Sequence, residues 1–179
     1  EGLGDARSFL LLGGFYLAGA IGHDSKAKHV CLDGLTASLI ASGILTPTFA
    51  TVVGRERPTA GQGAYSLRPF SGRSFPSGHT TQAFAVASVI ATSYEPLWVK
   101  VAAYGAATVT AYVRVQRGKH FPTDVVVGAV IGTAVGQSVV HFNRRLRSGE
   151  SEPERAGARL TLLPVVSGDA LGVSATLAF

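Results

Sequence analysis

The stretch FPSGHT, at residues 75–80, stands between the longest irregular segment of the chain and an apolar run typical of a helix. A Pro-Ser-Gly turn that feeds a helix leaves backbone amides aimed outward, and the helix dipole adds positive potential to them. Gly78 lets a ligand approach the backbone, Ser77 can bond a phosphate oxygen, and His79 can donate a proton to a leaving oxygen. We therefore expect an anion cradle here, although in isolation Ser77 is more often a plain N-cap and His79 a structural histidine.

The irregular segment before this turn, residues 54–77, contains three Pro, four Gly and several arginines. It is too long for an idle connection, and long loops in compact domains usually carry function. Arg57, fixed by the following Pro58, can offer its planar guanidinium to two phosphate oxygens. Taken alone this is weak evidence, because a basic loop is usually just solvated surface.

A third segment combines Arg114, His120 and Asp124, with Pro122 placed to begin a helix. A carboxylate four residues from an imidazole can accept its N–H, fix its tautomer and present the other nitrogen as a nucleophile. Arg114 would neutralise charge that develops on a phosphoryl group. The alternative interpretation of the His120 and Asp124 pair is a helix-capping contact.

Apolar periodicity and the breaks between periodic segments predict an all-α fold of about five or six helices. The expected ranges are residues 5–22, 25–53, 79–94, 97–116 and 122–146, which together form a helical domain over residues 1–143. Residues 144–159 are charged and contain Gly and Pro, as in a linker or a frayed helix end. Residues 160–179 alternate apolar and small residues around Ser167, Gly168 and Asp169, which predicts a small C-terminal β-hairpin.

The composition suits one core of closely packed helices, with 46% hydrophobic residues, 8% aromatic residues and 22 Gly among 179 residues. The net charge of +5 favours anionic partners. Nucleic acid is excluded as a partner because no basic face studded with aromatic residues is present.

Membrane placement is harder to derive from composition. Residues 34–53 carry no charge and reach the roughly 20 residues of a spanning helix, but they are rich in Thr, Ser and Gly and contain Pro47. We therefore favour a soluble or peripheral protein over an integral one. The chain starts at Glu1 and contains no Met, which suggests removal of an upstream segment such as a signal peptide, or trimming.

Together, and in this order, the three segments resemble the type 2 phosphatidic acid phosphatase (PAP2) superfamily, which includes bacterial class A acid phosphatases and vanadium haloperoxidases. Its second signature, Pro-Ser-Gly-His, is complete at residues 76–79. Its third signature is Ser-Arg, five residues, His, three residues and Asp, and it is matched by Arg114, His120 and Asp124. The resemblance covers about residues 35–141 and implies an all-helical bundle.

The resemblance also implies a mechanism. His120 would attack phosphorus and form a phosphohistidine, Asp124 would orient His120, and His79 would protonate the departing alkoxide, with no metal or cofactor required. The substrate would be a phosphate monoester or diphosphate, either a lipid phosphate, an isoprenoid diphosphate or a small ester, cleaved in the periplasm or cell envelope and in contact with a membrane surface. The phosphate oxygens would be held by Arg57, Arg114 and the Ser77 and Gly78 backbone, with the Ser77 hydroxyl.

Two positions depart from the family pattern. The first signature has a Lys seven residues before its Arg-Pro, whereas this chain has Ala50 there, so either Arg55 or Arg73 reaches into the gap or the site is weakened. Val113 replaces the Ser of the third signature. Two alternative functions accompany the phosphatase hypothesis: a vanadate-dependent haloperoxidase, since vanadate mimics phosphate geometry, and a catalytically weak envelope binding protein on the same fold that has lost the lysine.

Overall fold

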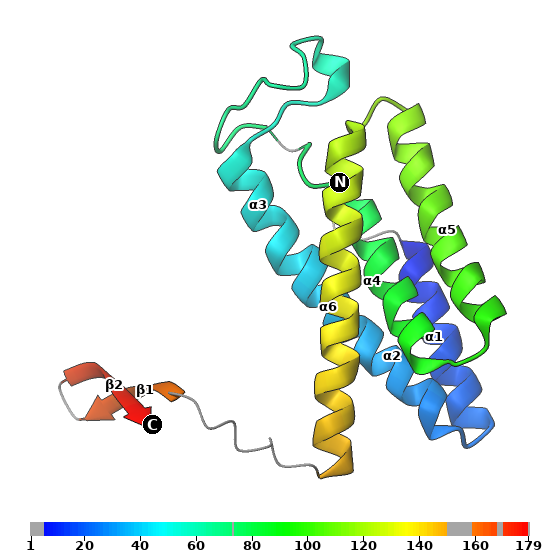
Figure 1. Ribbon diagram of the computed structural model, residues 1–179, viewed down its shortest axis with the longest axis vertical. Helices are drawn as coiled ribbons and strands as arrows, with labels where there is room; N and C mark the ends of the chain where they lie inside the picture. Colours follow the sequence, from blue (N-terminus) through cyan, green and yellow to red (C-terminus); the bar gives the residue numbers. More distant parts are fainter. Residues whose placement is uncertain (1–5, 73, 150–158, 168–169, 179) are drawn as a thin grey trace. The chain divides into compact units, whose positions relative to one another are not determined.

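The computed structural model describes residues 6–72, 74–149, 159–167 and 170–178, with side chains for residues 8–72 and 74–149. Long helices dominate it (Figure 1). They are α1 (Ala6–Ile21), α2 (Ser25–Ser38), α3 (Thr46–Val53), α4 (Gly78–Ser93), α5 (Leu97–Gln116) and α6 (Pro122–Ser148), with the π-helix η1 (Leu39–Leu45) and the 3-10 turn η2 (Pro58–Ala60). The predicted helical bundle is confirmed, and each expected range matches a helix or a continuous helical run to within two residues.

The segments α2, η1 and α3 form one uninterrupted helical run, Ser25–Val53, as the sequence predicts. Pro47 explains the π-helical turn in its middle, because proline lacks an N–H and its ring displaces the carbonyl one turn back. The Thr46 amide and hydroxyl instead both donate to the Ala41 carbonyl, the hydroxyl at 2.9 Å. The helix therefore passes the proline without breaking.

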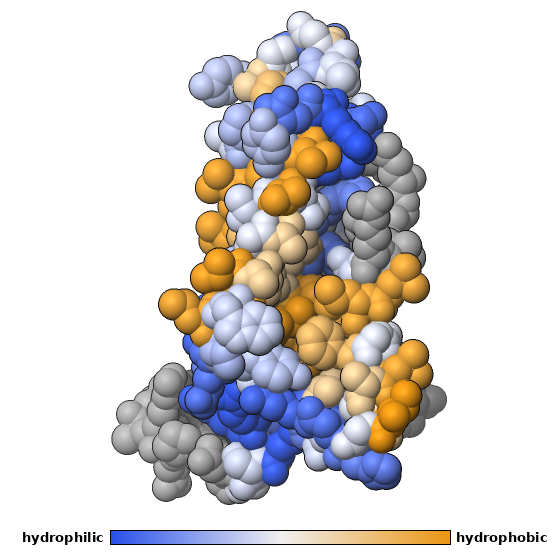
Figure 2. Space-filling model, turned by 90° about the vertical axis from the view of Figure 1, so that its right-hand side faces the viewer, coloured by the Kyte–Doolittle hydropathy of each residue, from blue (hydrophilic) through white to orange (hydrophobic). Residues whose placement is uncertain are grey.

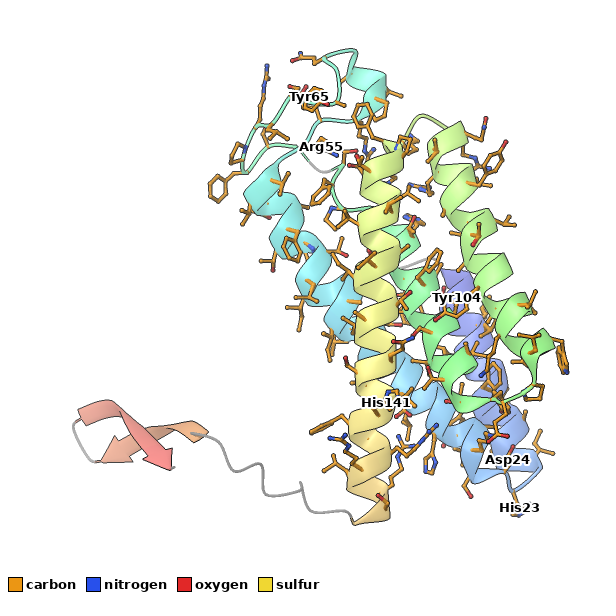
Figure 3. All side chains as sticks on the ribbon, viewed as in Figure 1. His23, Asp24, Arg55, Tyr65, Tyr104 and His141 are labelled. Carbon is orange, nitrogen blue, oxygen red and sulfur yellow. The ribbon has the colours of Figure 1, made fainter. Side chains whose placement is uncertain are left out.

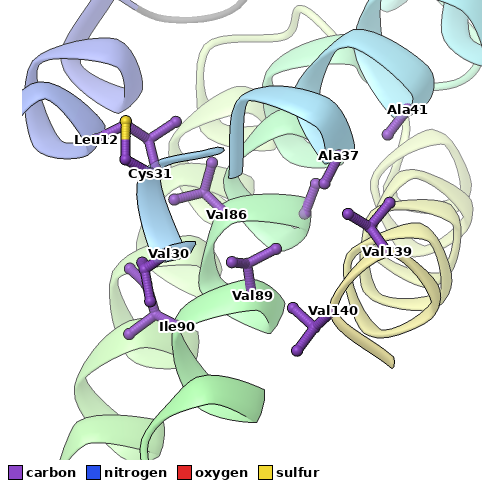
Figure 4. Packing of buried hydrophobic residues seen from close by; sticks show 11 residues of the cluster. Leu12, Val30, Cys31, Ala37, Ala41, Val86, Val89, Ile90, Val139 and Val140 are labelled. Atoms are coloured by element: carbon purple, nitrogen blue, oxygen red, sulfur yellow. The ribbon is translucent and has the colours of Figure 1, made fainter. Parts of the chain in front are cut away.

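Leu12 of α1 and mostly small or β-branched side chains of α2, η1, α4 and α6 form the core (Figure 4). Because these side chains are short, the helices approach one another closely and dispersion contacts are dense. The buried members are Leu12, Val30, Cys31, Ala37, Ala41, Ala85, Val86, Val89, Ile90, Val139 and Val140.

Three glycines one turn apart, Gly128, Gly132 and Gly136, place α6 directly against α4. A Cβ on Gly132 would overlap the carbonyl oxygen of Thr81, and a Cβ on Gly128 would lie 2.9 Å from the carbonyl oxygen of Ser77. No side chain larger than hydrogen fits this contact without movement of one helix. The glycine spacing thus fixes the position of the α6 N-terminus relative to the turn before α4.

The irregular segment after α3 begins with Gly54, whose φ of 59° lies in the left-handed region. A Cβ there would overlap the backbone of Arg68, and the Gly54 carbonyl accepts the Arg68 amide at 2.8 Å. The Arg55 carbonyl then accepts the Ser74 amide at 2.8 Å. These bonds close the base of the segment and bring its two ends together.

The chain divides into two compact units, Glu1–Arg144 and Arg145–Phe179. In the second unit β1 (Arg159–Ser167) pairs antiparallel with β2 (Ala170–Ala178), with Arg159 opposite Ala178. The predicted turn residues Gly168 and Asp169, and most of the predicted linker, lie outside the described residues. The α6 helix continues to Ser148, beyond the expected end of the helical domain at residue 143.

The close contact between α4 and α6 predicts that Gly132→Ala is destabilising. Overpacking of this kind typically costs about 1–3 kcal/mol. The matched control is Gly105→Ala in α5, where an added Cβ meets nothing within 4 Å and the higher helix propensity of Ala is expected to stabilise by roughly 0.5–1 kcal/mol. Thermal unfolding followed by circular dichroism would measure both, and an equal melting temperature for the two variants would contradict the packing argument.

Candidate active site

The C-terminal end of α3, the start of α4 and the connection from α5 to α6 meet at one end of the helical unit (Figure 1). Arg55 and Tyr65 lie at this end, whereas His23 and Asp24 lie at the other (Figure 3). The three predicted motif segments, far apart in the sequence, are therefore gathered in one place.

His120 is buried, with 5% of its surface exposed, and its Nδ1 lies 2.7 Å from the carbonyl oxygen of Ser74. A carbonyl oxygen can only accept, so Nδ1 carries the proton and, in the neutral ring, Nε2 is the basic nitrogen. The predicted acceptor was Asp124, but its Oδ2 lies 4.0 Å from His120 Nδ1. Ser74 supplies the tautomer-fixing bond because Asp124 already accepts from other donors.

Asp124 is fully buried in the first turn of α6. Its Oδ1 accepts from Arg55 Nη1 at 2.5 Å, and its Oδ2 accepts from Ser74 Oγ at 2.6 Å and from the Phe121 amide at 2.8 Å. A buried carboxylate requires such compensation, since an unpaired buried charge is strongly unfavourable. The carboxylate therefore holds together the irregular loop, the α5–α6 connection and the start of α6.

Burial lowers the pKa of His120 below its ordinary value of 6.5. The hydrogen bond to the Ser74 carbonyl and the charge of Asp124 act in the opposite direction, while Arg114 and Arg57 lower the pKa further. Both predicted phosphate-binding arginines thus act electrostatically on His120. A neutral imidazole among cationic groups combines a free Nε2 lone pair with a positive potential that attracts an anion.

Ser77 is the residue before the first turn of α4, and its hydroxyl makes no capping bond. The Ser77 amide donates to the Asp124 carbonyl at 3.0 Å, so this amide is already used and does not point to a ligand as predicted. The Ser77 hydroxyl accepts from Thr80 Oγ1 at 3.0 Å, which directs its own proton elsewhere. Gly78 and His79 are the first two residues of α4 and are partly exposed.

The sequence motifs did not indicate Ser74 or the position of Arg55. Ser74 lies two residues before the Pro-Ser-Gly-His signature, and Arg55, which was one of two candidates to replace the missing family lysine, pairs with Asp124. Ala50, at the position of the family lysine, is partly buried in α3. Arg73 lies outside the described residues. Within the described part of the chain, no three His, Cys, Asp or Glu residues form a group that could hold a metal ion.

Residues 34–148, more than half of the chain, match the PAP2 superfamily. The chain belongs to the PAP2 superfamily. All three motif segments fall inside the matched range, and the resemblance inferred from them is confirmed.

Curated proteins and a solved structure resemble the chain over parts of its length. A lipid A 1-phosphatase of Porphyromonas gingivalis is 39% identical over 42% of this chain and 18% of its own length, and the undecaprenyl-diphosphatase BcrC of Bacillus subtilis is 28% identical over 70% of this chain and 64% of its own length. The crystal structure of Aquifex aeolicus LpxE matches 76% of this chain and 82% of its own, with a TM-score of 0.52 and 28% identity. The chain spans 18% to 64% of the length of the curated relatives.

The lowered pKa of His120 predicts a pH dependence of stability. Below pH 6.5 the unfolded chain binds a proton at this histidine that the folded protein binds only at lower pH. The contribution of His120 to the free energy of unfolding is therefore fully present above pH 6.5 and is lost as the pH falls. We expect the free energy of unfolding to fall less between about pH 7.5 and about pH 5.5 in His120→Gln than in the original protein. The exposed His141→Gln serves as the control, and identical pH dependence in all three proteins would contradict the assignment.

Proposed function

We propose that this PAP2 protein is a phosphatase that removes phosphate from a phosphorylated lipid, either a monoester or a diphosphate, through a phosphohistidine on His120. The observation that carries the proposal is the hydrogen bond from His120 Nδ1 to the Ser74 carbonyl, because it leaves Nε2 as the basic nitrogen beside two arginines. The names of the relatives, lipid A 1-phosphatase and undecaprenyl-diphosphatase, support the substrate class.

In the proposed first step Nε2 of His120 forms a bond to phosphorus while the bond from phosphorus to the leaving oxygen breaks. His79 donates its proton to that oxygen, and water then attacks phosphorus with its proton taken by His79. The N–P bond breaks, phosphate leaves and His120 is restored. Asp124, 4.0 Å from Nδ1, offsets the positive charge that the phosphorylated ring acquires.

The phosphoryl oxygens would be bound by Arg57 and Arg114, whose charges already act on His120. The Gly78 amide and the Ser77 hydroxyl would complete the site at the N-terminus of α4, where the helix dipole favours an anion. The developing negative charge of the transition state would therefore meet fixed donors rather than reorganising water.

The surface supports a lipid substrate rather than a small polar ester. Hydrophobic residues gather in a band between hydrophilic ends (Figure 2). Two helical runs, Ser25–Val53 and Pro122–Ser148, are long and apolar enough to cross a membrane by length and composition, and only 22% and 33% of their apolar windows are buried. The helices also carry large apolar side chains more than 60% exposed: Leu10, Ile21, Leu39, Val101, Val130 and Leu146.

We propose that these helices lie in the membrane of the cell envelope, with the site at the membrane surface. This differs from the soluble or peripheral placement that the Thr-rich and Ser-rich composition of residues 34–53 favoured. The Thr hydroxyls of α2, η1 and α3 donate to carbonyls of their own helical run, such as Thr36 to Leu32 and Thr48 to Ile44, so they can enter an apolar medium without losing a partner.

The decisive experiment compares phosphate release from a detergent-dispersed lipid phosphate and from p-nitrophenyl phosphate, with chelator present, by the original protein and His120→Ala. We expect the lipid to be cleaved with the higher kcat/KM, and the variant to fall to background on both substrates. Acid-labile, base-stable radiolabel on the original protein, absent from the variant, would report the phosphohistidine. Full activity of His120→Ala would refute the proposed nucleophile.

The irregular loop offers a second test of the lipid hypothesis, because Tyr65 and Phe70 are 93% and 84% exposed there. Aromatic rings favour the interface between membrane and water. Changing both to Ser is expected to raise KM for the dispersed lipid by roughly tenfold, since burial of one large apolar side chain contributes about 1.5–3 kcal/mol.

The same double variant should keep its KM for p-nitrophenyl phosphate, because neither ring belongs to the phosphate site. Ala60→Ser, an exposed position of the same loop, is the matched control. An equal rise in KM for both substrates would show that the loop shapes the phosphate site and does not contact the lipid.

A further inference from the structure

Ser74 links the nucleophile to the irregular loop through three hydrogen bonds. Its carbonyl accepts from His120 Nδ1 at 2.7 Å, its hydroxyl donates to Asp124 Oδ2 at 2.6 Å, and its amide donates to the Arg55 carbonyl at 2.8 Å. Ser74 is fully buried, so these bonds are protected from exchange with water. The orientation of the His120 ring is therefore tied to the position of one serine.

Arg55 binds the other oxygen of the Asp124 carboxylate. Its Nη1 donates to Asp124 Oδ1 at 2.5 Å and to Thr123 Oγ1 at 2.9 Å. The guanidinium also lies over the rings of Phe75, at 5.1 Å, and Phe121, at 6.0 Å. A planar cation held by a carboxylate, a hydroxyl and two aromatic rings has a well-defined orientation.

Asp124 stands between these two residues and does not bond His120 directly. The carboxylate receives Arg55 on Oδ1 and Ser74 on Oδ2, while His120 Nδ1 stays 4.0 Å away. A continuous series of contacts therefore runs from Arg55 through Asp124 and Ser74 to the imidazole.

We propose that Arg55 and Ser74 are positioning residues for His120, with Arg55 clamping Asp124, Asp124 fixing Ser74, and the Ser74 carbonyl holding Nδ1–H so that Nε2 faces the phosphoryl group. The hydrogen-bond series exists whatever the protein cleaves, and only its purpose rests on the phosphatase proposal. The cation two residues before Arg57 thus serves the nucleophile, not the phosphate.

The competing role for Arg55 is a direct bond to the phosphate in place of the family lysine, because position 50 is Ala and the buried Nε of Arg55 has no hydrogen-bond partner among the described residues. The two roles differ in what they change. A phosphate ligand acts on substrate binding, whereas a clamp on Asp124 acts on the state and orientation of the imidazole.

Electrostatics gives the clamp a measurable signature. The charged groups that act on His120 are Arg57 from the loop, Arg114 from α5 and Asp124 from α6, and Arg55 neutralises Asp124. Without the Arg55 charge, Asp124 becomes an uncompensated anion beside the ring. Since Asp124 raises the pKa of His120, its release from Arg55 shifts the titration of His120 to higher pH.

The test uses the full chain in detergent micelles, as the original protein, Arg55→Gln, Arg55→Lys, Ser74→Ala and the exposed control Arg117→Gln. Nitrogen NMR of labelled histidines reads the tautomer and titration of His120, and kinetics on p-nitrophenyl phosphate gives kcat and KM. For Arg55→Gln we expect a titration at higher pH and a kcat lower by roughly tenfold to hundredfold, as for a misplaced catalytic group, with KM changed by less than about twofold. Arg55→Lys should recover part of both, and Arg117→Gln should match the original protein.

An unchanged His120 titration in Arg55→Gln, together with a raised KM that Ala50→Lys restores, would overturn the proposal in favour of the phosphate-binding role. If Arg55→Gln does not fold, Ser74→Ala decides, because it keeps the carbonyl and removes only the hydroxyl bond to Asp124. An unchanged tautomer, titration and kcat in Ser74→Ala would also overturn it. Absence of phosphate release by the original protein would refute the phosphatase proposal alone, since the NMR titration needs no substrate.

Discussion

The buried carboxylate of Asp124 joins segments that are far apart in the sequence. It accepts from Arg55 and Ser74 of the loop and from the Phe121 amide of the α5–α6 connection. Because a buried anion without donors costs several kcal/mol, the loop cannot leave this position without a large penalty. The loop of residues 54–77, rich in Gly, Pro and Arg, is thereby held in a conformation that its own backbone propensities do not determine.

This arrangement depends on how closely α6 packs on α4. The glycines of α6 let its first turn reach the residues before α4, so that the Ser77 amide meets the Asp124 carbonyl at 3.0 Å. A larger residue at Gly128 or Gly132 would push the two helices apart, and this bond would lengthen. The same glycine contact between α4 and α6 therefore sets both the packing of the bundle and the geometry of the site.

The sequence was sufficient for the helices and for the membership of the family, since both depend on local patterns. Apolar periodicity locates each helix, and the spacing of Arg114, His120 and Asp124 identifies the third signature without any knowledge of the fold. Hydrogen bonds between residues far apart in the sequence could not be predicted from local patterns. A spacing of four suggested that Asp124 accepts from His120, but the geometry gives that acceptor role to Ser74, 46 residues away.

The site lies at one end of the helical unit, apart from the apolar flanks of the helices, and this separation suits a phosphorylated lipid. The groups that would bind a phosphate are arginine cations and buried polar side chains, which need hydrogen-bond partners and partial hydration. The helix flanks instead expose Leu, Val and Ile side chains. A phosphorylated lipid has the same division, with an anionic head and an apolar body. A protein that places arginines such as Arg55, Arg57 and Arg114 at one end of an apolar bundle can bind such a head without removing the lipid chains from their own medium, so less desolvation opposes the encounter.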